Sequence, residues 1–361
     1  TGQPTVLEAC GDSYKDYDNR VSAMTGLPTV LGWYVHEWLW RNNLDEENKR
    51  RTFLATEITK PLNLSTISIS KAIKPSRNDS YTLTSTTTTR YFLSKNSDFI
   101  SKEGITLYLN DEFKYIDIYT YKKVTSTNDI AKKLALNGAK HGTIVISEEQ
   151  TNGKGRLGRS FYSPANTGIY MSIILKLSLT TMDSVLITTS SAVAICDAIE
   201  KLTGINCQIK WINDIYLNGK KIAGILAETF TNFESKTIDY LILGIGLNFT
   251  QPKNDFPEEL RKIASSLFEH NNSTINRNLL CAEIANNILN MISKIENYDF
   301  ISEYKKRSIV LNQDIIYTSK GISLIGKAID IANDGSLIVK NSDGSTKILN
   351  SGDITIRKVN E

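Results

Sequence analysis

The sequence has few of the residues that build metal and disulfide sites. Its 361 residues include only four cysteines and three histidines. The cysteines lie far apart without a C-x-x-C pair, and no two histidines form H-E-x-x-H. These patterns exclude a zinc ribbon and argue against a disulfide scaffold or histidine-based metal catalysis. We therefore expect reduced thiols and a cytoplasmic protein.

Long apolar runs and a strong excess of one charge are missing as well. The best candidates for a membrane span, residues 27–40 and 184–196, fall short of the roughly 20 apolar residues required, so we expect no membrane association. The 42 Lys and Arg against 39 Asp and Glu leave a formal charge of +3, which argues against nucleic-acid binding over the whole surface. The composition, with 40% hydrophobic residues, is globular, and the length indicates two or three domains.

The first 96 residues differ in character from the rest. Residues 1–50 form an atypical extension rich in Gly, Tyr and Trp, and the sequence does not indicate its role. Residues 51–96 place apolar residues at helical spacing on both sides of a turn and then continue as β-branched strand material over 81–93. Two short helices followed by strands outline a winged helix-turn-helix, and a small α+β linker domain fits the pattern equally well.

A winged helix would contact DNA through its second helix, with Ser65 as the N-cap and Lys71 on the helix as candidate DNA-binding residues. That helix carries only two cations, Lys71 and Lys74. DNA affinity depends on several Lys or Arg contacts to phosphates, so the sequence leaves DNA binding open.

Residues 97–304 alternate strands with helices and form the largest predicted domain. Strands are expected at residues 143–147, 168–175, 215–217, 222–227 and 240–247, and helices at 183–202, 258–269 and 277–296. Asn218-Gly219 is a type I′ hairpin signal, and frequent hairpins indicate a mixed or largely antiparallel sheet of the α+β class. Residues 305–361 are short strands separated by four turn signals, which predicts a small SH3-like β-barrel.

A glycine-rich basic loop follows the strand at 143–147. Its glycines alternate with cations: Gly153, Lys154, Gly155, Arg156, Gly158 and Arg159. Glycine lets backbone N–H groups approach an oxyanion, and the cations supply the charge that a polyphosphate requires. The string is neither a Walker A loop nor a G-x-G-x-x-G motif that opens a helix. A polar loop of about 20 residues between strands is long, which favours a ligand clamp over a solvated loop.

A second group of polar residues lies in an otherwise apolar segment. Lys210 precedes Trp211, and Asn213-Asp214 follows at once. The lysine is either an edge residue that reaches solvent or a fixed charge for a carboxylate or phosphate. The amide and carboxylate would suit a nucleotide or Mg²⁺, and a plain turn is the alternative.

Together these motifs resemble those of the biotin protein ligases. Three carry the likeness in order and spacing: GKGRLGR (153–159), KWINDIYLNGKKIAGILAE (210–228) and GIGLNF (244–249). The same pattern also contains VTSTND (124–129), EEQ (148–150) and GDITIR (352–357). The resemblance covers residues 97–357 and implies a central sheet like that of class II aminoacyl-tRNA synthetases. Residues 53–93 resemble the winged helix-turn-helix of the repressor-type members.

The resemblance implies a two-step reaction. Biotin is activated with ATP, in the presence of Mg²⁺, to biotinyl-5′-AMP, and is then transferred to a lysine of a biotin carboxyl carrier protein domain. A lipoate-protein ligase shares the fold and is the alternative, although the basic loop and the C-terminal barrel favour biotin. The repressor-type members also imply a homodimer.

The resemblance assigns roles to residues, position by position. The biotin-binding positions are Ser126, Thr127, Asn128, Gln150, Lys154, Gly155, Arg156 and Lys210. The ATP-binding positions are Gly153, Arg159, Asn213, Asn248 and Arg357, and no metal ligand is assigned. Lys210 and Arg156 are the catalytic candidates, because their charges would offset the repulsion between a carboxylate and the α-phosphate. Where the family usually has Arg, Lys154 keeps the charge and loses the two-pronged hydrogen bonding, so we expect altered retention of the adenylate.

Overall fold

The computed structural model describes residues 83–85, 91–93, 98–176, 179–180, 183–231, 237–252, 254–270, 272–319, 322–352 and 354–356. The chain separates into two compact units, Thr1–Phe99 and Ile100–Glu361. In the first unit, β1 (Leu83–Ser85) and β2 (Tyr91–Leu93) pair antiparallel, as the strand pattern of residues 81–93 predicts. The extension of residues 1–50, the expected helix pair and the DNA-binding candidates Ser65 and Lys71 lie outside the described residues.

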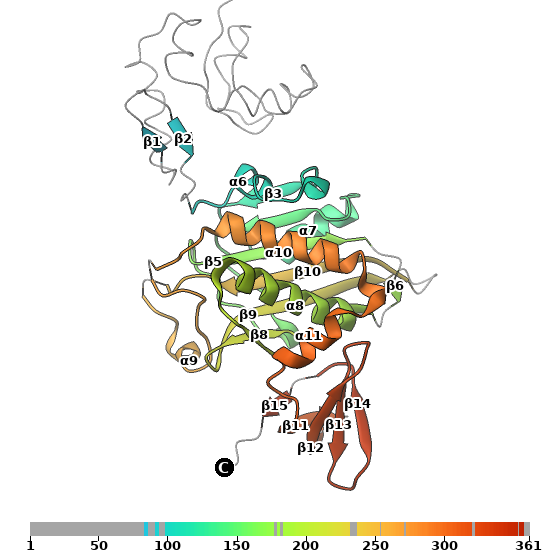
Figure 1. Cartoon of the computed structure of the whole chain (residues 1–361). Coiled ribbons are helices and arrows are strands. Elements are labelled where there is room, and N and C mark those ends of the chain that lie inside the picture. Colours follow the sequence, from blue (N-terminus) through green and yellow to red (C-terminus); the bar gives the residue numbers. More distant parts are fainter. Residues whose placement is uncertain are drawn as a thin grey trace, which may run out of the picture. The chain divides into compact units, whose positions relative to one another are not determined.

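An eight-stranded mixed sheet organises the second unit (Figure 1). The strands are β3 (Ile118–Tyr121), β4 (Ile144–Ser147), β5 (Gly168–Leu175), β6 (Leu179–Thr180), β7 (Gln208–Lys210), β8 (Asp214–Leu217), β9 (Lys220–Thr231) and β10 (Thr237–Asn248). They run in the order β3-β4-β5-β10-β9-β8-β7, with β6 paired to the start of β10. β3 is parallel to β4, and the other described pairs are antiparallel. The mixed sheet confirms the predicted α+β class.

Helices cover both faces of this sheet. They are α6 (Lys102–Thr106), α7 (Thr127–Leu136), α8 (Asp183–Thr203), α9 (Glu258–Arg261), α10 (Arg277–Ile292) and α11 (Phe300–Arg307), with 3-10 turns η2 (Asp111–Phe113), η3 (Arg156–Gly158) and η4 (Ile295–Asn297). Val145, Ile174 and Ile242 pack under α7, whereas their neighbours along each strand join the main core with α8, α10 and α11. Figure 1 shows these three helices in front of the sheet. Within the described ranges, no helix has the length and apolar character needed to cross a membrane.

The helix expected over residues 258–269 is shorter than the sequence pattern indicates. α9 ends at Arg261, and the chain then runs extended along the sheet. Ala264 forms a bridge with Lys221, and Phe268 forms one with Thr250. Backbone hydrogen bonds to these segments replace the helical ones, so tertiary pairing overrides the local helical spacing.

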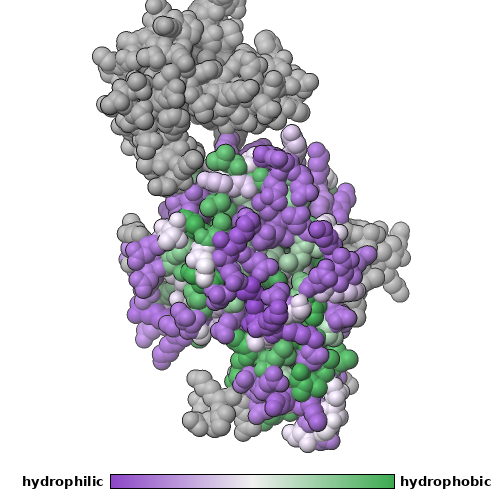
Figure 2. Space-filling model, in the orientation of Figure 1, coloured by the Kyte–Doolittle hydropathy of each residue, from purple (hydrophilic) through white to green (hydrophobic). Residues whose placement is uncertain are grey.

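A second sheet ends the chain. Its strands are β11 (Asp314–Ser319), β12 (Ile322–Ile331), β13 (Leu337–Asn341), β14 (Thr346–Leu349) and β15 (Ile354–Ile356), in the order β14-β13-β12-β11-β15. The described pairs are all antiparallel, which confirms the strand-and-turn pattern predicted for this region. Figure 2 shows apolar residues gathered over this sheet, whereas the helical face of the central sheet is mostly hydrophilic. The exposed apolar side chains here include Ile322 and Ile348.

The C-terminal sheet is joined to the segment that carries the KWIND motif. Trp211 Nε1 donates a buried 2.9 Å hydrogen bond to the Gly335 carbonyl in the β12–β13 turn. Gly335 has a φ of +82°, and a Cβ there would lie 2.8 Å from Thr189 Oγ1 on α8, so glycine lets the turn approach the helix. On α11, the Tyr304 hydroxyl donates to the Ile212 carbonyl over 2.9 Å. Residues 211 and 212 are therefore held by both the C-terminal sheet and the helical layer.

We predict that Trp211→Phe, which keeps an aromatic ring but removes the indole N–H, destabilises the protein. The buried Gly335 carbonyl would lose its donor, which typically costs about 1–3 kcal/mol. Urea unfolding followed by circular dichroism measures the loss. Tyr298→Phe, at a side chain that is 42% exposed, is the control and should change the free energy of unfolding by less than about 0.5 kcal/mol. Equal unfolding midpoints for Trp211→Phe and the wild type would contradict the prediction.

Candidate active site

A cavity lies where the N-terminus of α7 and the basic loop meet β9 and β10. The basic loop comprises residues 148–167 and connects β4 to β5. The cavity is lined by Ser126, Thr127, Asn128, Gln150, Lys154, Gly155, Arg156, Phe161, Asn213, Lys221, Gly224, Ile225, Leu226, Gly244, Ile245 and Gly246. Its volume is only about 50 Å³, whereas small-molecule sites usually span about 300–1,000 Å³. The cavity in this structure is thus narrower than a typical small-molecule site.

Glycines on β10 make room for the cavity's polar lining. A Cβ on Gly244 would lie within 2.9 Å of the Asn128 amide, and a Cβ on Gly246 would lie 2.6 Å from the Phe161 ring. Both approaches are far closer than a side chain tolerates, so these two positions require glycine. The glycines of the GIGLNF motif thus form a glycine floor: they let Asn128 of α7 and Phe161 of the basic loop pack directly against β10.

The start of α7 places polar groups at the cavity. Ser126 is the N-cap residue, and its hydroxyl makes no capping hydrogen bond. The Thr127 amide and hydroxyl donate to Gln150 Oε1 over 2.8 and 3.1 Å. Gln150 Nε2 donates in turn to Ser163 Oγ over 3.0 Å. These bonds connect both ends of the basic loop to α7.

Asn128 is oriented by two partners from different strands. The Ser172 hydroxyl on β5 donates to Asn128 Oδ1 over 2.6 Å. Asn128 Nδ2 donates to Glu228 Oε2 on β9, also over 2.6 Å. Because donor and acceptor sides of the amide are both engaged, the Asn128 side chain has one defined orientation.

Three cations line the cavity, and two of them are paired with carboxylates. Lys154 Nζ lies 2.5 Å from Asp129 Oδ1, and this hydrogen bond raises the pKa of Lys154 above its usual value. Lys221 Nζ lies 2.6 Å from Asp214 Oδ1. Both charges are thus compensated inside the protein before any ligand arrives.

Arg156 is the cavity cation that contacts neutral oxygens. Its Nη1 donates to Asn213 Oδ1 over 2.9 Å, and its Nη2 lies 3.4 Å from the Gly352 carbonyl between β14 and β15. Since neither of these contacts is to a carboxylate, Arg156 is the group best prepared to receive an anion. The same contacts link the basic loop to the C-terminal sheet.

The structure gathers eight of the predicted site residues at the cavity and places the others nearby or elsewhere. Lys210 ends β7 opposite Asp214, is half-buried and is not a lining residue. Asn248 Nδ2 donates to the Ser265 carbonyl over 2.9 Å, away from the lining. Arg159 is exposed, and its carbonyl accepts from the Gly155 amide.

Gly153, another predicted site residue, lies outside the cavity lining. A Cβ on Gly153 would lie 2.5 Å from the Phe161 carbonyl, so this glycine closes the fold of the loop. Arg357 lies outside the described residues. The sequence analysis did not single out Phe161 and Lys221, two residues that line the cavity. Lys221 belongs to the motif of residues 210–228, and its positive charge within that motif is the feature that could have indicated a site residue.

The sequence and the fold match a known class of ligases. Residues 120–248 match the Biotin/lipoate A/B protein ligase family, and residues 310–357 match the Biotin protein ligase C terminal domain. The biotin protein ligase of Aquifex aeolicus, solved with biotin and ATP, has the same fold. It superposes with a TM-score of 0.57 at 24% identity, covering 67% of this chain and 99% of that chain.

The sequence relatives narrow this class to one family. The bifunctional ligase/repressor BirA of Bacillus subtilis is 30% identical over 308 residues, covering 83% of this chain and 92% of the relative. The biotin--[acetyl-CoA-carboxylase] ligase of Mycobacterium tuberculosis is 27% identical, covering 63% of this chain and 85% of the relative. The chain belongs to the biotin protein ligase family.

We predict that Asp129→Asn tightens biotin binding, because it removes the carboxylate that competes with a ligand for Lys154. A partly exposed ion pair contributes up to about 1 kcal/mol, so the gain should be about two- to fivefold in Kd. Isothermal titration with biotin measures it. Asp111→Asn removes the exposed pair with Lys114 and should leave the Kd unchanged. Weaker binding by Asp129→Asn would show that the ion pair assists the ligand instead.

Proposed function

We propose that this chain activates biotin with ATP to biotinyl-5′-AMP and transfers the biotin to a lysine of a biotin carboxyl carrier protein domain. One observation carries the proposal: a single cavity brings the Ser126–Asn128 segment, Gln150 and the basic loop together over a glycine floor. Relatives named biotin--[acetyl-CoA-carboxylase] ligase, from Mycobacterium tuberculosis and Paracoccus denitrificans, support the acceptor class. The match to a biotin-ligase C-terminal domain favours biotin over lipoate.

The polar end of the cavity suits the cyclic urea of biotin. A urea offers one carbonyl acceptor and two N–H donors, so its site needs hydrogen-bonding groups of both kinds. The hydroxyls of Ser126 and Thr127 can donate or accept, and the amides of Asn128 and Gln150 do both. In this assignment Lys154, Gly155 and Arg156 surround the opposite, carboxylate end of the ligand, and Lys210 reaches it from the end of β7, outside the cavity lining.

In the first step an oxygen of the biotin carboxylate forms a bond to the α-phosphorus of ATP, and pyrophosphate leaves with the electron pair of the broken P–O bond. Two anions must meet, and their repulsion is the main obstacle. Arg156 and Lys210 lower it by placing positive charge beside both the carboxylate and the α-phosphate. The two oxygens that Arg156 contacts, on Asn213 and Gly352, are neutral, so it can turn to the reactants without breaking an ion pair with them.

In the second step the acceptor lysine amine attacks the carbonyl carbon of the mixed anhydride, and AMP leaves. No enzyme nucleophile is needed, because the anhydride is already activated. The basic loop covers the intermediate and limits hydrolysis until the acceptor domain arrives. Its hydrogen bonds to α7 through Gln150 support this role.

We assign the nucleotide to Gly153, Arg159, Asn213, Asn248 and Arg357. Mg²⁺ fits beside it as an ion held mainly by the substrate phosphates, because no group of three His, Cys, Asp or Glu side chains gathers within the described residues. We propose Asn213 and Asp214 as the protein ligands of the ion. Asp214 Oδ1 is a buried oxygen that lies 2.6 Å from Lys221 Nζ. When bound, Mg²⁺ neutralises phosphate charge.

We predict that Lys210→Ala lowers the rate of biotin-AMP formation about 10²- to 10³-fold, the usual loss when a preorganised charge leaves a reacting centre. Pyrophosphate release and labelling of an acceptor domain both measure it. Lys220→Ala is a matched control in the same motif, because its ammonium donates to the Arg261 carbonyl at the surface. Full labelling by Lys210→Ala would remove the role of Lys210, and no pyrophosphate release by the wild type would remove the proposed function.

A second candidate function is transcriptional repression. The Bacillus subtilis relative is named a bifunctional ligase/repressor, and its match covers more residues than Ile100–Glu361 contain, so it extends into the first unit. We propose residues 51–96 as a winged-helix domain after the extension of residues 1–50. Residues 97–304 would then be the catalytic domain and residues 305–361 the C-terminal domain.

We predict that operator DNA from a biotin operon is bound more tightly when biotin and ATP are both present, in a gel-shift assay. Lys71→Ala should weaken the complex and lower the slope of log K against log[salt] by about 1, the change expected for one lost phosphate contact. Lys327→Ala, at an exposed position of β12, should change neither. Binding that ignores both ligands and the Lys71 substitution would contradict this second function.

A further inference from the structure

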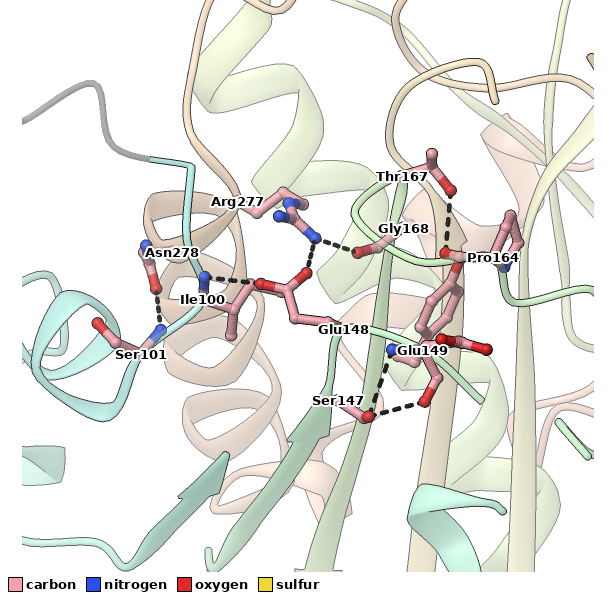
Figure 3. Close-up of polar contacts among 11 residues, drawn as sticks. Ile100, Ser101, Ser147, Glu148, Glu149, Pro164, Thr167, Gly168, Arg277 and Asn278 are labelled. Carbon is pink, nitrogen blue, oxygen red and sulfur yellow. Dashed lines mark hydrogen bonds and ion pairs between the residues drawn. The ribbon is translucent and has the colours of Figure 1, made fainter. Parts of the chain in front are cut away.

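A buried arginine lies at the base of the basic loop. Arg277 is the first residue of α10, and its side chain is 2% exposed. Its Nη1 donates to Glu148 Oε2 over 2.5 Å and to the Gly168 carbonyl over 3.2 Å (Figure 3). One guanidinium nitrogen therefore bridges two backbone segments that are far from it in sequence.

Those two segments are the stems of the basic loop. Glu148 is the first residue after β4, and Gly168 is the first residue of β5. The loop between them carries Gln150, Lys154 and Arg156 to the cavity. Arg277 thus joins the point where the loop leaves the sheet to the point where it returns.

Each stem is held further by its own hydrogen bonds. Glu148 Oε1 accepts from the Ile100 amide over 3.0 Å, and the Glu148 carbonyl accepts from the Asn166 amide over 3.3 Å. On the other stem, Thr167 Oγ1 donates to the Pro164 carbonyl over 3.2 Å (Figure 3). The Tyr170 hydroxyl donates to the same carbonyl over 2.9 Å. Burial raises the pKa of Tyr170, which keeps this hydroxyl protonated as a donor.

The position of Arg277 is unfavourable for the stability of α10 considered alone. A cation at a helix N-terminus opposes the helix dipole, and the first turn of α10 contains no acidic residue. A buried guanidinium also requires a partner, which Glu148 supplies from another element. Such a local conflict is typical of residues kept for a site rather than for a helix.

We propose that Arg277 is a positioning residue for the reaction: with Glu148 it ties the two stems of the basic loop together and so sets where Gln150, Lys154 and Arg156 meet the ligand. Arg277 itself does not line the cavity. The inference rests on the proposed biotin ligase function. It predicts weaker biotin binding and poorer retention of biotinyl-5′-AMP when the tie is lost, because the loop residues no longer share one geometry.

The test is the double variant Glu148→Gln with Arg277→Met, which removes the tie without leaving a buried unpaired charge. The KM for biotin should rise about tenfold and the adenylate should dissociate about tenfold faster, whereas kcat should stay within about threefold. Glu148→Gln alone offers one acceptor oxygen to the Ile100 amide and Arg277 together, so it weakens the tie without removing it. It should shift the KM in the same direction by a smaller factor, and it tests the tie even if the double variant does not fold.

Arg307→Met is the matched control. Arg307 also pairs with acids, Asp197 and Glu200, but lies outside the cavity lining. It should lower the thermal midpoint and leave the KM for biotin unchanged. A biotin KM and an adenylate lifetime within twofold of wild type in both Glu148 variants would overturn the proposal, as would an equal KM rise in Arg307→Met. Pyrophosphate release by the wild type, measured alongside, separates these outcomes from a failure of the proposed function.

Discussion

Repulsion between two negatively charged reactants is the constraint that explains the arrangement of this site. A cavity that brings a carboxylate to a phosphate must collect cations, and a folded protein must compensate those cations while the cavity is empty. Lys154 and Lys221 are compensated by Asp129 and Asp214. Arg156 is held by amide and carbonyl oxygens instead, so its charge remains available at little cost.

The basic loop can serve such a site only if it returns to one position after each opening. The loop begins where β4 ends and returns where β5 begins. Its Phe161 packs over Gly246 of β10, and its Arg156 contacts the Gly352 carbonyl next to the C-terminal sheet. The C-terminal sheet also holds Trp211 through Gly335. The C-terminal sheet therefore contacts both the basic loop and the segment that carries Lys210 and Trp211. These contacts fix the two segments relative to each other.

Local sequence patterns predicted the elements well where the local signal and the tertiary environment agree. The strand over residues 168–175 matches β5, and the positive φ angles of Asn218 and Gly219 confirm the predicted hairpin between β8 and β9. The helix over residues 258–269 was wrong beyond Arg261, because extended pairing with neighbouring segments replaced it. The cavity residues Ser126, Thr127, Asn128 and Gln150 were predicted because they fall in short contiguous motifs.

By itself the sequence determined the α+β class, the glycine-rich cationic loop and the family to which these motifs belong, since each depends on residues close together in the chain. Only the tertiary structure decided which charges are compensated, why Gly244 must lack a side chain, and that Arg277 holds Glu148 from 129 residues away. A contact between distant residues leaves no periodic or spacing signal in one sequence. Such a contact forms only when the central sheet and its helices fold, because folding brings residues such as Glu148 and Arg277 together.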